Sequence, residues 1–474
     1  MEPIEKVLLS WRMRMAGGPG QATPAVPASP LASLLASLGR ERKAGRPWRS
    51  RGPRPRPRML APSPMADFYP LPPFFLGMGL LLALAATPLC RPADAPPGQA
   101  ASRMPALDGL RGILALAVFF HHAAIYPRLL AGQGWGLPPA HAYAVMGKGA
   151  VGMFFIITGY LFWAKLLRKE GRPSWLALYA GRLFRIGPLY LVVILAMLAL
   201  LFGRDGGELR EPATQVAGQV GEWLLLGAGN RPDVNAHAGT NLLTAGVTWT
   251  LQYEWIFYAS LPLAALLART GRRETWLTLA LLLLCLAWAG GHLGPWAGAD
   301  EPGFVTLFLI GMSCASLEAR GLGRTLSGPG TSPRADRAAS VLVVGLVAIW
   351  FGAVPLPNDA IALAVMGLVF WLVRSGCTVF GLLTLRATRR LGDASYGIYL
   401  LHGLVLALAF AFPWVKQAAA TPLGFWSVVI ACGIPLIALA TLLHALVEQP
   451  GIRAGRRVAR WIGNRRFRTA PAKG

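Results

Sequence analysis

Residues 183–202 read LFRIGPLYLVVILAMLALLF, a run of 20 residues in which Arg185 carries the only charge. About 20 apolar residues form a helix long enough to cross the ~30 Å hydrocarbon core of a bilayer. Nine more apolar blocks accompany this one, and together the ten blocks are 107–126, 147–167, 183–202, 242–267, 275–293, 304–317, 340–354, 360–373, 396–412 and 423–447. The sequence therefore predicts an all-α polytopic transmembrane helix bundle of about ten spans.

The composition of the whole chain agrees with a membrane protein. Of its 474 residues, 54% are hydrophobic and 14% are charged, and the mean hydropathy is +0.48. Soluble globular domains carry roughly 25% charged and 45–50% apolar residues, so a single soluble domain is excluded. The five cysteines form no close pair, and the sequence predicts neither a disulfide scaffold nor a metal site.

The distribution of positive charge predicts the orientation. The formal net charge is +25, but the basic residues lie in short loops between apolar blocks, which argues against nucleic-acid binding. If the first span starts in the cytoplasm, the inside loops and the C-terminal tail hold 25 Lys and Arg and the outside loops hold six. Positively charged loops stay in the cytoplasm. We therefore predict a multi-pass protein of the cell inner (cytoplasmic) membrane with both ends of the bundle in the cytoplasm.

The first hundred residues differ from the rest. Residues 1–103 are rich in Ala, Pro, Gly and Arg and contain one apolar segment, 71–90. A span at 71–90 would place residue 107 outside if the Arg-rich stretch 40–58 stays inside, which would invert the predicted topology. We therefore expect residues 1–103 to be a disordered or non-native extension, with translation beginning at Met104. The transmembrane domain is expected at 104–450 and a basic cytoplasmic tail at 451–474.

Ionisable side chains in a membrane span are costly and mark functional sites. Arg111 and His122 lie eleven residues apart in the first span, which places them within ~20° on one helix face and ~16 Å apart along the axis. His121 points about 80° away from that face. Alone, Arg111 would be interpreted as a topology anchor and His122 as a core histidine.

Two further spans carry polar residues. Glu254 lies about twelve residues into the fourth span, among aromatic residues that include Trp249. In the ninth span, Tyr396, Tyr399 and His402 recur every three residues and therefore share a helix side. Each of these would be unremarkable alone, because aromatic residues commonly serve packing or the membrane interface.

Six sequence blocks together resemble the membrane-bound acyltransferase-3 family of O-acyltransferases over roughly residues 105–450. They are LDGLRG (107–112) followed by His122, FFIITGYLF (154–162), RLFRIGPLY (182–190), WTLQYEWIFY (249–258), LGDASYGIYLLH (391–402) and the closing LVEQP (446–450). Two positions depart from the family pattern: Gly152 stands where an Asp is common, and Thr158 replaces a Ser.

The resemblance implies transfer of an acyl group, by family habit acetyl, from cytoplasmic acyl-CoA to a hydroxyl of a carbohydrate or glycoconjugate. No permanently bound cofactor is expected. The candidate catalytic residues are His122, Glu254 and Arg111. His122 would act as general base or form an acyl-histidine intermediate, and Glu254 would orient it, stabilise its cation or bind acceptor hydroxyls. The candidate residues for CoA binding are Arg111, Arg182 and Arg185, and those for acceptor binding are Trp249, Tyr399 and His402. Positive-inside anchoring explains Arg182 and Arg185 equally well.

Two other classes compete with this interpretation. A transporter or flippase of a lipid-linked saccharide would use the same buried polar residues, but the sequence shows no internal repeat of the kind such proteins carry. A purely structural membrane protein would not need buried Arg, His and Glu. The acceptor stays open among surface polysaccharide, lipopolysaccharide, peptidoglycan, glucan and small glycosylated metabolites. The frequent Ala, Gly, Arg and Pro indicate a GC-rich bacterial genome, and hence a role in the bacterial cell envelope.

Overall fold

Each of the ten apolar blocks coincides with a helix in the computed structural model, which describes residues 66–94, 104–204, 206–289, 301–322, 333–352 and 360–468. All of these residues belong to a single unit, Pro62–Gly474. The ten helices are α4 (Pro105–Ala123), α6 (His141–Arg168), α7 (Trp175–Arg204), α9 (Trp249–Ala268), α10 (Arg273–Ala289), α11 (Glu301–Ala319), α12 (Pro333–Gly352), α13 (Ala360–Arg374), α15 (Ser395–Ala409) and α17 (Pro422–Leu443).

Shorter elements connect or flank these helices. The α-helices among them are α3 (Pro72–Ala86), α5 (Tyr126–Leu130), α8 (Ala213–Leu224), α14 (Arg386–Asp393), α16 (Pro413–Ala418) and α18 (Gln449–Arg468). Short 3-10 helices occur at η1 (Ala66–Phe68), η2 (Pro88–Ala93), η4 (Thr240–Thr244) and η6 (Leu382–Thr384), and η7 (His444–Glu448) is a π-helix. The described part of the chain contains no β-strand, which confirms the predicted all-α class.

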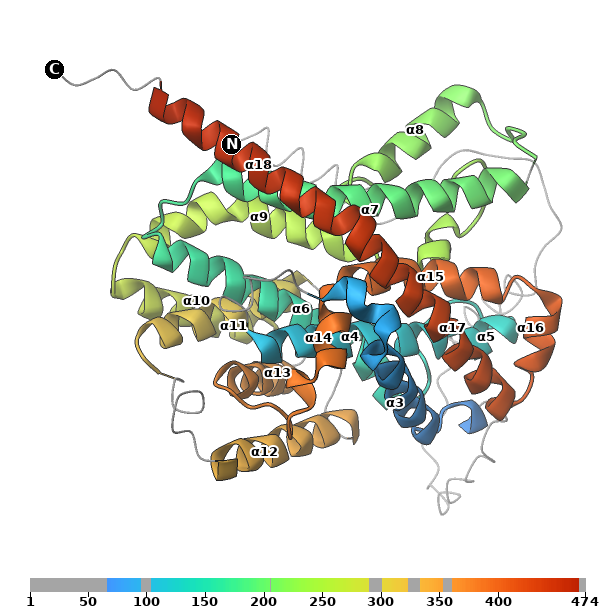
Figure 1. Cartoon of the computed structure of the whole chain (residues 1–474), viewed down its shortest axis with the longest axis horizontal. Coiled ribbons are helices and arrows are strands. Elements are labelled where there is room, and N and C mark those ends of the chain that lie inside the picture. Colours follow the sequence, from blue (N-terminus) through green and yellow to red (C-terminus); the bar gives the residue numbers. More distant parts are fainter. Residues whose placement is uncertain are drawn as a thin grey trace, which may run out of the picture. The chain divides into compact units, whose positions relative to one another are not determined.

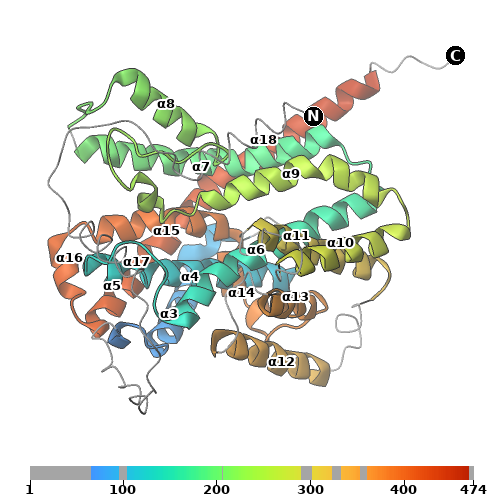
Figure 2. The same ribbon diagram turned by 180° about the vertical axis from the view of Figure 1, so that it is seen from behind.

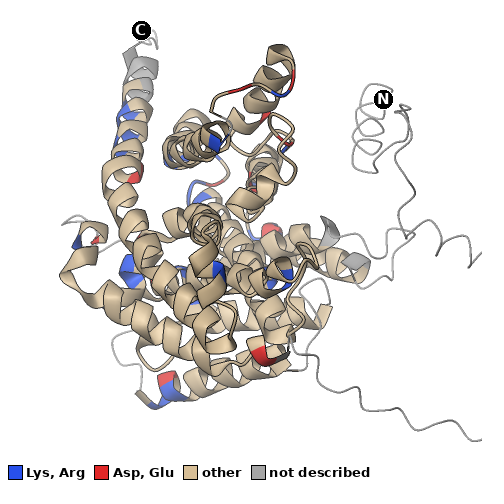
Figure 3. Cartoon of the chain, turned by 90° about the vertical axis from the view of Figure 1, so that its right-hand side faces the viewer, with Lys and Arg blue, Asp and Glu red and all other residues tan. Residues whose placement is uncertain are grey.

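The membrane character of the fold is clear, although fewer helices are long enough to span than the ten predicted. Five helices are long and apolar enough to cross a bilayer, or six if α14 and α15, which meet at 73°, form one broken span. The apolar helices α3 and α13 have only 15 residues each and reach about 22 Å at 1.5 Å per residue. The count of ten spans and the cytoplasmic ends therefore stay predictions. Charged side chains are sparse over most of the bundle and gather along α18 near the C-terminus (Figure 3).

Helix α4 occupies the centre of the bundle, where it packs against α6, α14 and α15 (Figure 1). Helix α6 pairs with α11, and α18 packs along α7, as the view from behind also shows (Figure 2). Gly109 and Gly112 let α4 approach its neighbours closely, because a Cβ atom at either position would overlap backbone atoms of Leu383 or Thr388. The LDGLRG block is thus a packing surface, and it fixes the position of Arg111 between its two glycines.

Residues 66–94, part of the extension predicted at 1–103, form helical segments that pack on the bundle. Helix α3 packs against α14 and α17, and its side chains Leu81 and Ala85 are fully buried. The buried guanidinium group of Arg390 donates hydrogen bonds to the carbonyl oxygens of Ala85, Ala86 and Thr87 at 2.9–3.0 Å. The sequence argument counted Arg390 as a topology anchor, whereas its side chain satisfies the C-terminus of α3. Residues 1–65 and 95–103 lie outside the described residues, so the remainder of that prediction is untested.

Candidate active site

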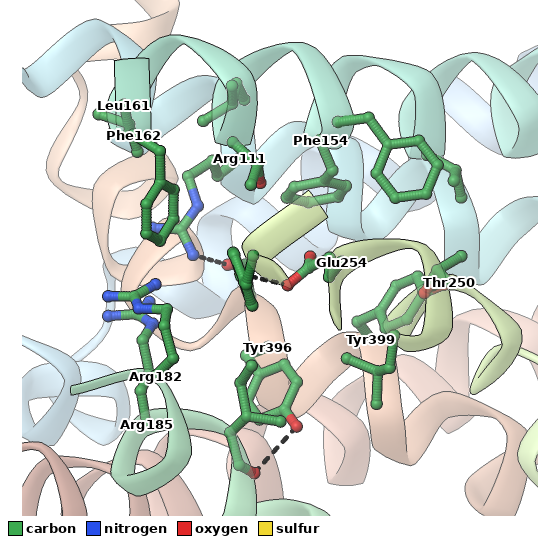
Figure 4. Close-up of a pocket in the computed structure, with 18 residues that line it drawn as sticks. Arg111, Phe154, Leu161, Phe162, Arg182, Arg185, Thr250, Glu254, Tyr396 and Tyr399 are labelled. Carbon is green, nitrogen blue, oxygen red and sulfur yellow. Dashed lines mark hydrogen bonds between the residues drawn. The ribbon is translucent and has the colours of Figure 1, made fainter. Parts of the chain in front are cut away.

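A cavity of about 220 Å³ lies where α4, α6, α7, α9 and α15 meet (Figure 4). It gathers five residues that the sequence singled out from four separate helices. These are Arg111, Arg182, Arg185, Glu254 and Tyr399. The guanidinium groups lie at one side of the cavity, and the carboxylate of Glu254 faces them from the other side (Figure 4). These five side chains thus meet in one cavity.

The three arginines are positioned by different neighbours. Arg111 donates a hydrogen bond from Nη2 to the Ser395 hydroxyl at 3.1 Å. The guanidinium of Arg182 lies over the ring of Phe162, 5.1 Å from its centroid, which allows a cation–π interaction. Nη2 of Arg185 lies 3.6 Å from Oε1 of Glu448. Arg182 and Arg185 reach the same cavity because three residues bring a helix through almost one turn.

The carboxylate of Glu254 has a fixed orientation. The hydroxyl of Tyr258, four residues later in α9, donates to Oε2 at 2.6 Å (Figure 4). A hydroxyl donor at this distance makes a strong, charge-assisted hydrogen bond. Glu254 is thus held by its own helix. In the sequence, Tyr258 is one of the aromatic residues that flank Glu254, and its spacing of four residues from Glu254 is the signal that predicts this contact.

Of the three candidate acceptor-binding residues, Tyr399 lines the cavity, whereas Trp249 and His402 do not. Tyr399 lines the cavity, donates to the Val247 carbonyl at 3.1 Å and shares a 2.9 Å hydrogen bond with the Thr250 hydroxyl. Trp249 does not line it, and packs instead in an aromatic cluster with Tyr253 and Phe304 at centroid distances of 5.6 and 5.2 Å. The belt or packing interpretation therefore describes Trp249 better than direct contact in this cavity.

His122 and His402 form a hydrogen-bonded pair beyond Tyr399. Nε2 of His402 lies 3.0 Å from Nδ1 of His122, and the rings of Tyr399 and His402 contact each other with centroids 6.2 Å apart. His402 is fully buried and neither histidine lines the cavity. His402 thus contacts His122, and its suggested acceptor-binding role stays a prediction. Among the described residues, it is this histidine, and not Glu254, that hydrogen-bonds the His122 ring.

The hydrogen-bond partners assign the tautomers of the pair. Nδ1 of His402 lies 3.2 Å from the carbonyl oxygen of Ile398, which can only accept, so the proton belongs on Nδ1 and Nε2 is an acceptor. Nδ1 of His122 then faces two acceptors, that Nε2 and the carbonyl of Val118 at 3.0 Å. It must carry its proton, and the lone pair of His122 is on Nε2. This nitrogen is the candidate base.

A second buried polar group reaches the cavity indirectly. Glu448 is fully buried, accepts from Nδ1 of His444 at 2.9 Å and faces Arg185. His444 and Glu448 bound the π-helical turn η7, and such turns are frequent at functional sites. Glu448 belonged to the quoted LVEQP block, but no role was assigned to it, because the sequence could not show which residue it would meet.

No group of three or more His, Cys, Asp and Glu side chains is arranged to hold a metal ion among the residues that the structure describes. The chemistry of the cavity is that of guanidinium, carboxylate, hydroxyl and imidazole groups. Such a set binds anions and moves protons.

Comparisons with known proteins identify the family of the chain. The family model described as an acyltransferase domain matches residues 104–445. An acyltransferase of Streptomyces mycarofaciens, MdmB, is 28% identical over 392 residues, which cover 75% of this chain and 93% of that protein. Nodulation protein 10 of Rhizobium leguminosarum bv. viciae is 27% identical over 321 residues, covering 64% of this chain and 82% of that protein. No solved structure matches. The matched region contains the arginines, Glu254 and the histidine pair, and the chain belongs to the acyltransferase-3 family of membrane acyltransferases.

Proposed function

We propose that this transferase moves an acyl group, acetyl in the first instance, from cytoplasmic acyl-CoA to a hydroxyl of a carbohydrate or glycoconjugate acceptor. It acts in the cytoplasmic membrane as a ten-span protein whose ends face the cytoplasm. The observation that carries the proposal is the cavity in which Arg111, Arg182 and Arg185 converge next to the His122–His402 pair.

The charges around the cavity favour an anionic donor. Three guanidinium groups are opposed by two carboxylates, Glu254 and Glu448, so the five groups carry one net positive charge. Guanidinium groups bind phosphate oxygens through paired N–H donors, and a phosphate-bearing donor adds the negative charge that the site lacks. Glu254 then serves to space and orient the guanidinium groups, since Tyr258 fixes its carboxylate opposite them.

The acyl group has to travel from the arginines toward His122. Arg111 and His122 are eleven residues apart on α4, about 16 Å along the helix axis. Tyr399 stands between the cavity and the histidine pair, so we place the thioester against its ring. The long pantetheine arm of CoA suits this separation between phosphate groups and reacting carbon.

The reaction needs one base that later acts as an acid. Nε2 of His122 removes the proton from the acceptor hydroxyl while that oxygen attacks the thioester carbonyl carbon. The C–S bond then breaks, the new C–O ester bond remains, and the imidazolium returns its proton to the departing CoA thiolate. His402 holds His122 in the tautomer that this step requires, in the way that an orienting partner assists a catalytic histidine.

The test uses purified protein in nanodiscs with [14C]acetyl-CoA. Donor binding and acetyl transfer to a panel of glycan acceptors are measured for the wild type and for three variants. His122→Ala is expected to bind acetyl-CoA normally and to lose at least 100-fold in transfer. Arg182→Gln is expected to weaken donor binding about tenfold. His121→Gln is the control, because His121 is engaged with the Tyr143 carbonyl at 2.7 Å. Unchanged transfer by His122→Ala would refute the mechanism.

A further inference from the structure

A second cavity, of about 400 Å³, lies at the opposite end of the same helices. On α7, Arg185 lines the first cavity and Arg204 lines the second, about 28 Å further along the helix axis. On α15, Tyr396 lines the first cavity. Phe410, the residue after α15, lines the second cavity about 21 Å further along the axis. The two cavities therefore open toward opposite ends of the bundle, with the histidine pair between them.

The wall of the second cavity reaches His122 directly. The indole of Trp135 lines the cavity and stacks on the His122 ring, with centroids 6.1 Å apart and planes 21° apart. Tyr126, another lining residue, meets Trp135 edge-on at 6.0 Å and stacks on Phe410 at 4.5 Å. One aromatic side chain thus separates a ligand in this cavity from the candidate base. No lining residue of the first cavity has a stacking contact with His122 among the described residues.

The charge of the second cavity has one sign. Arg204 and Lys416 approach it from α7 and α16, and both side chains are exposed. The described lining residues include no Asp or Glu. Two cations beside an apolar, aromatic wall suit a ligand that has a carbon-rich face and a separate anionic group.

We propose that the second cavity is the acceptor site and that it selects a saccharide bearing a phosphate or carboxylate group. A sugar ring packs against Trp135, the residue that stacks on His122, while the anionic group lies between Arg204 and Lys416. This inference rests on the proposed function and deepens it by naming the acceptor class. It assigns the two cavities to two substrates, so that donor and acceptor meet at the histidine pair from opposite ends.

The experiment measures binding and not transfer, so it does not depend on catalysis. Purified full-length protein in phosphatidylcholine nanodiscs is titrated with radiolabelled octyl glucoside 6-phosphate and, separately, with octyl glucoside. The phosphorylated probe is expected to bind at least tenfold more tightly, and the preference should shrink as ionic strength rises, because exposed charges are screened.

Variants locate the binding site. Arg204→Gln/Lys416→Gln is expected to abolish the preference for the phosphorylated probe without changing the affinity for the neutral one. Trp135→Ala should weaken the binding of both probes, and Arg210→Gln, six residues after Arg204 but outside the cavity lining, should change neither. Equal affinity for the two probes would overturn the proposal. So would a preference that survives in the double variant.

Further measurements distinguish a lipid headgroup from a saccharide as the source of the anionic group, and distinguish failure of this inference from failure of the proposed function. If nanodiscs containing phosphatidylglycerol displace the phosphorylated probe, and the double variant removes that displacement, the cavity holds a lipid headgroup and the acceptor assignment is wrong. Inorganic phosphate at equal concentration should compete poorly, since it lacks the sugar. If the wild type shows no preference for the phosphorylated probe but turns over acetyl-CoA normally, this inference alone is refuted. If the wild type shows the preference but does not transfer acetyl, the proposed function alone is refuted.

Discussion

Replacing Arg390 by Met is expected to loosen the attachment of residues 66–94 to the bundle. The guanidinium is 3% exposed and donates five hydrogen bonds into this segment. Two of them go to the carboxylate of Asp94, at 2.7 and 2.9 Å, and three to the last carbonyl groups of α3. Removing one member of a buried ion pair costs about 3–5 kcal/mol. Because the Asp94 side chain is 41% exposed and regains water, we use the lower end, about 3 kcal/mol.

Cys90 reports this opening. Its side chain is 1% exposed and its sulfur lies 3.8 Å from the Thr441 hydroxyl of α17, so a reagent reaches it only when the segment detaches. When opening and closing are fast, the labelling rate follows the opening equilibrium. A loss of 3 kcal/mol therefore raises the rate about 100-fold, at 1.4 kcal/mol per tenfold. The assay is alkylation of protein in nanodiscs, with the labelled peptides quantified by mass spectrometry.

Two controls make the result specific. Cys377 is fully buried against Ser340, away from α3, and its labelling should not change. The exposed neighbour Arg389, changed to Met, should leave the Cys90 rate unaltered. An unchanged Cys90 rate in Arg390→Met would refute the reasoning that this cap holds the segment. Wild-type Cys90 that labels as fast as an exposed thiol would show that residues 66–94 are not docked at all.

Three further predictions concern the Asp94 carboxyl, the His122–His402 pair and the Glu448–Arg185 ion pair. The Arg390 guanidinium holds the pKa of the Asp94 carboxyl below its ordinary value of 3.8. Its contribution to docking is therefore complete above pH 4 and lost as pH falls through the docked pKa. Hydrogen exchange of residues 72–94, corrected for the intrinsic rate, should accelerate modestly below pH 4 and stay flat from pH 5 to 8, whereas Asp94→Asn should show no such acid step. His402→Leu should lower acetyl transfer about 10- to 100-fold and change its pH profile without altering acetyl-CoA binding, with partial recovery in His402→Gln; an unchanged profile would mean that His402 does not set the tautomer of His122. Glu448→Ala should lower the free energy of unfolding by about 3 kcal/mol because buried Glu448 is the counter-ion of Arg185; a thermal transition like that of the wild type would contradict this role.

Much of the fold and part of the site follow from the sequence because they depend on local patterns. Apolar blocks of spanning length predict helices whatever their neighbours, and each of the ten blocks overlaps one of the ten helices. Charged residues at helical spacing predict a shared side, which brings Arg182 and Arg185 into one cavity. The family resemblance added Arg111 and Glu254 to the candidate residues, and both line the cavity.

Contacts between distant helices could not be predicted in this way. His122 and His402 are 280 residues apart, and Arg111 and Ser395 are 284 apart. A helical wheel gives the face on which a residue lies but not the helix that this face meets. Spacing predicts one helix face for Arg111 and His122, yet about 16 Å of helix is enough for Arg111 to line the cavity and for His122 to lie beyond Tyr399.

The orientation of α3 resolves the objection that excluded it. That objection assumed that residue 71 starts on the cytoplasmic side, so that a span at 71–90 would invert everything after it. In the structure, the start of α3 lies beside the starts of α6 and α17, where the Tyr143 hydroxyl donates to the Pro70 carbonyl and the Trp426 indole to that of Phe68. Its end lies beside α14, which also contacts the beginning of α4.

Helix α3 therefore runs parallel to α6 and α17 and opposite to α4. The chain leaves α3 at the same end of the bundle at which α4 begins, so an extra apolar helix before residue 104 leaves the sidedness of the ten later helices unchanged. The charge count and the docked segment are compatible if residue 71 lies on the side of the membrane opposite to the start of α4. Arg390 shows why the charge count alone led to the prediction that residues 71–90 are not part of the bundle. A cation in this position looks like a topology anchor in sequence, but its hydrogen bonds go to the carbonyl groups of residues 85–87 and to the Asp94 carboxylate. A charge that is hydrogen-bonded inside the protein carries little information about which loop faces the cytoplasm.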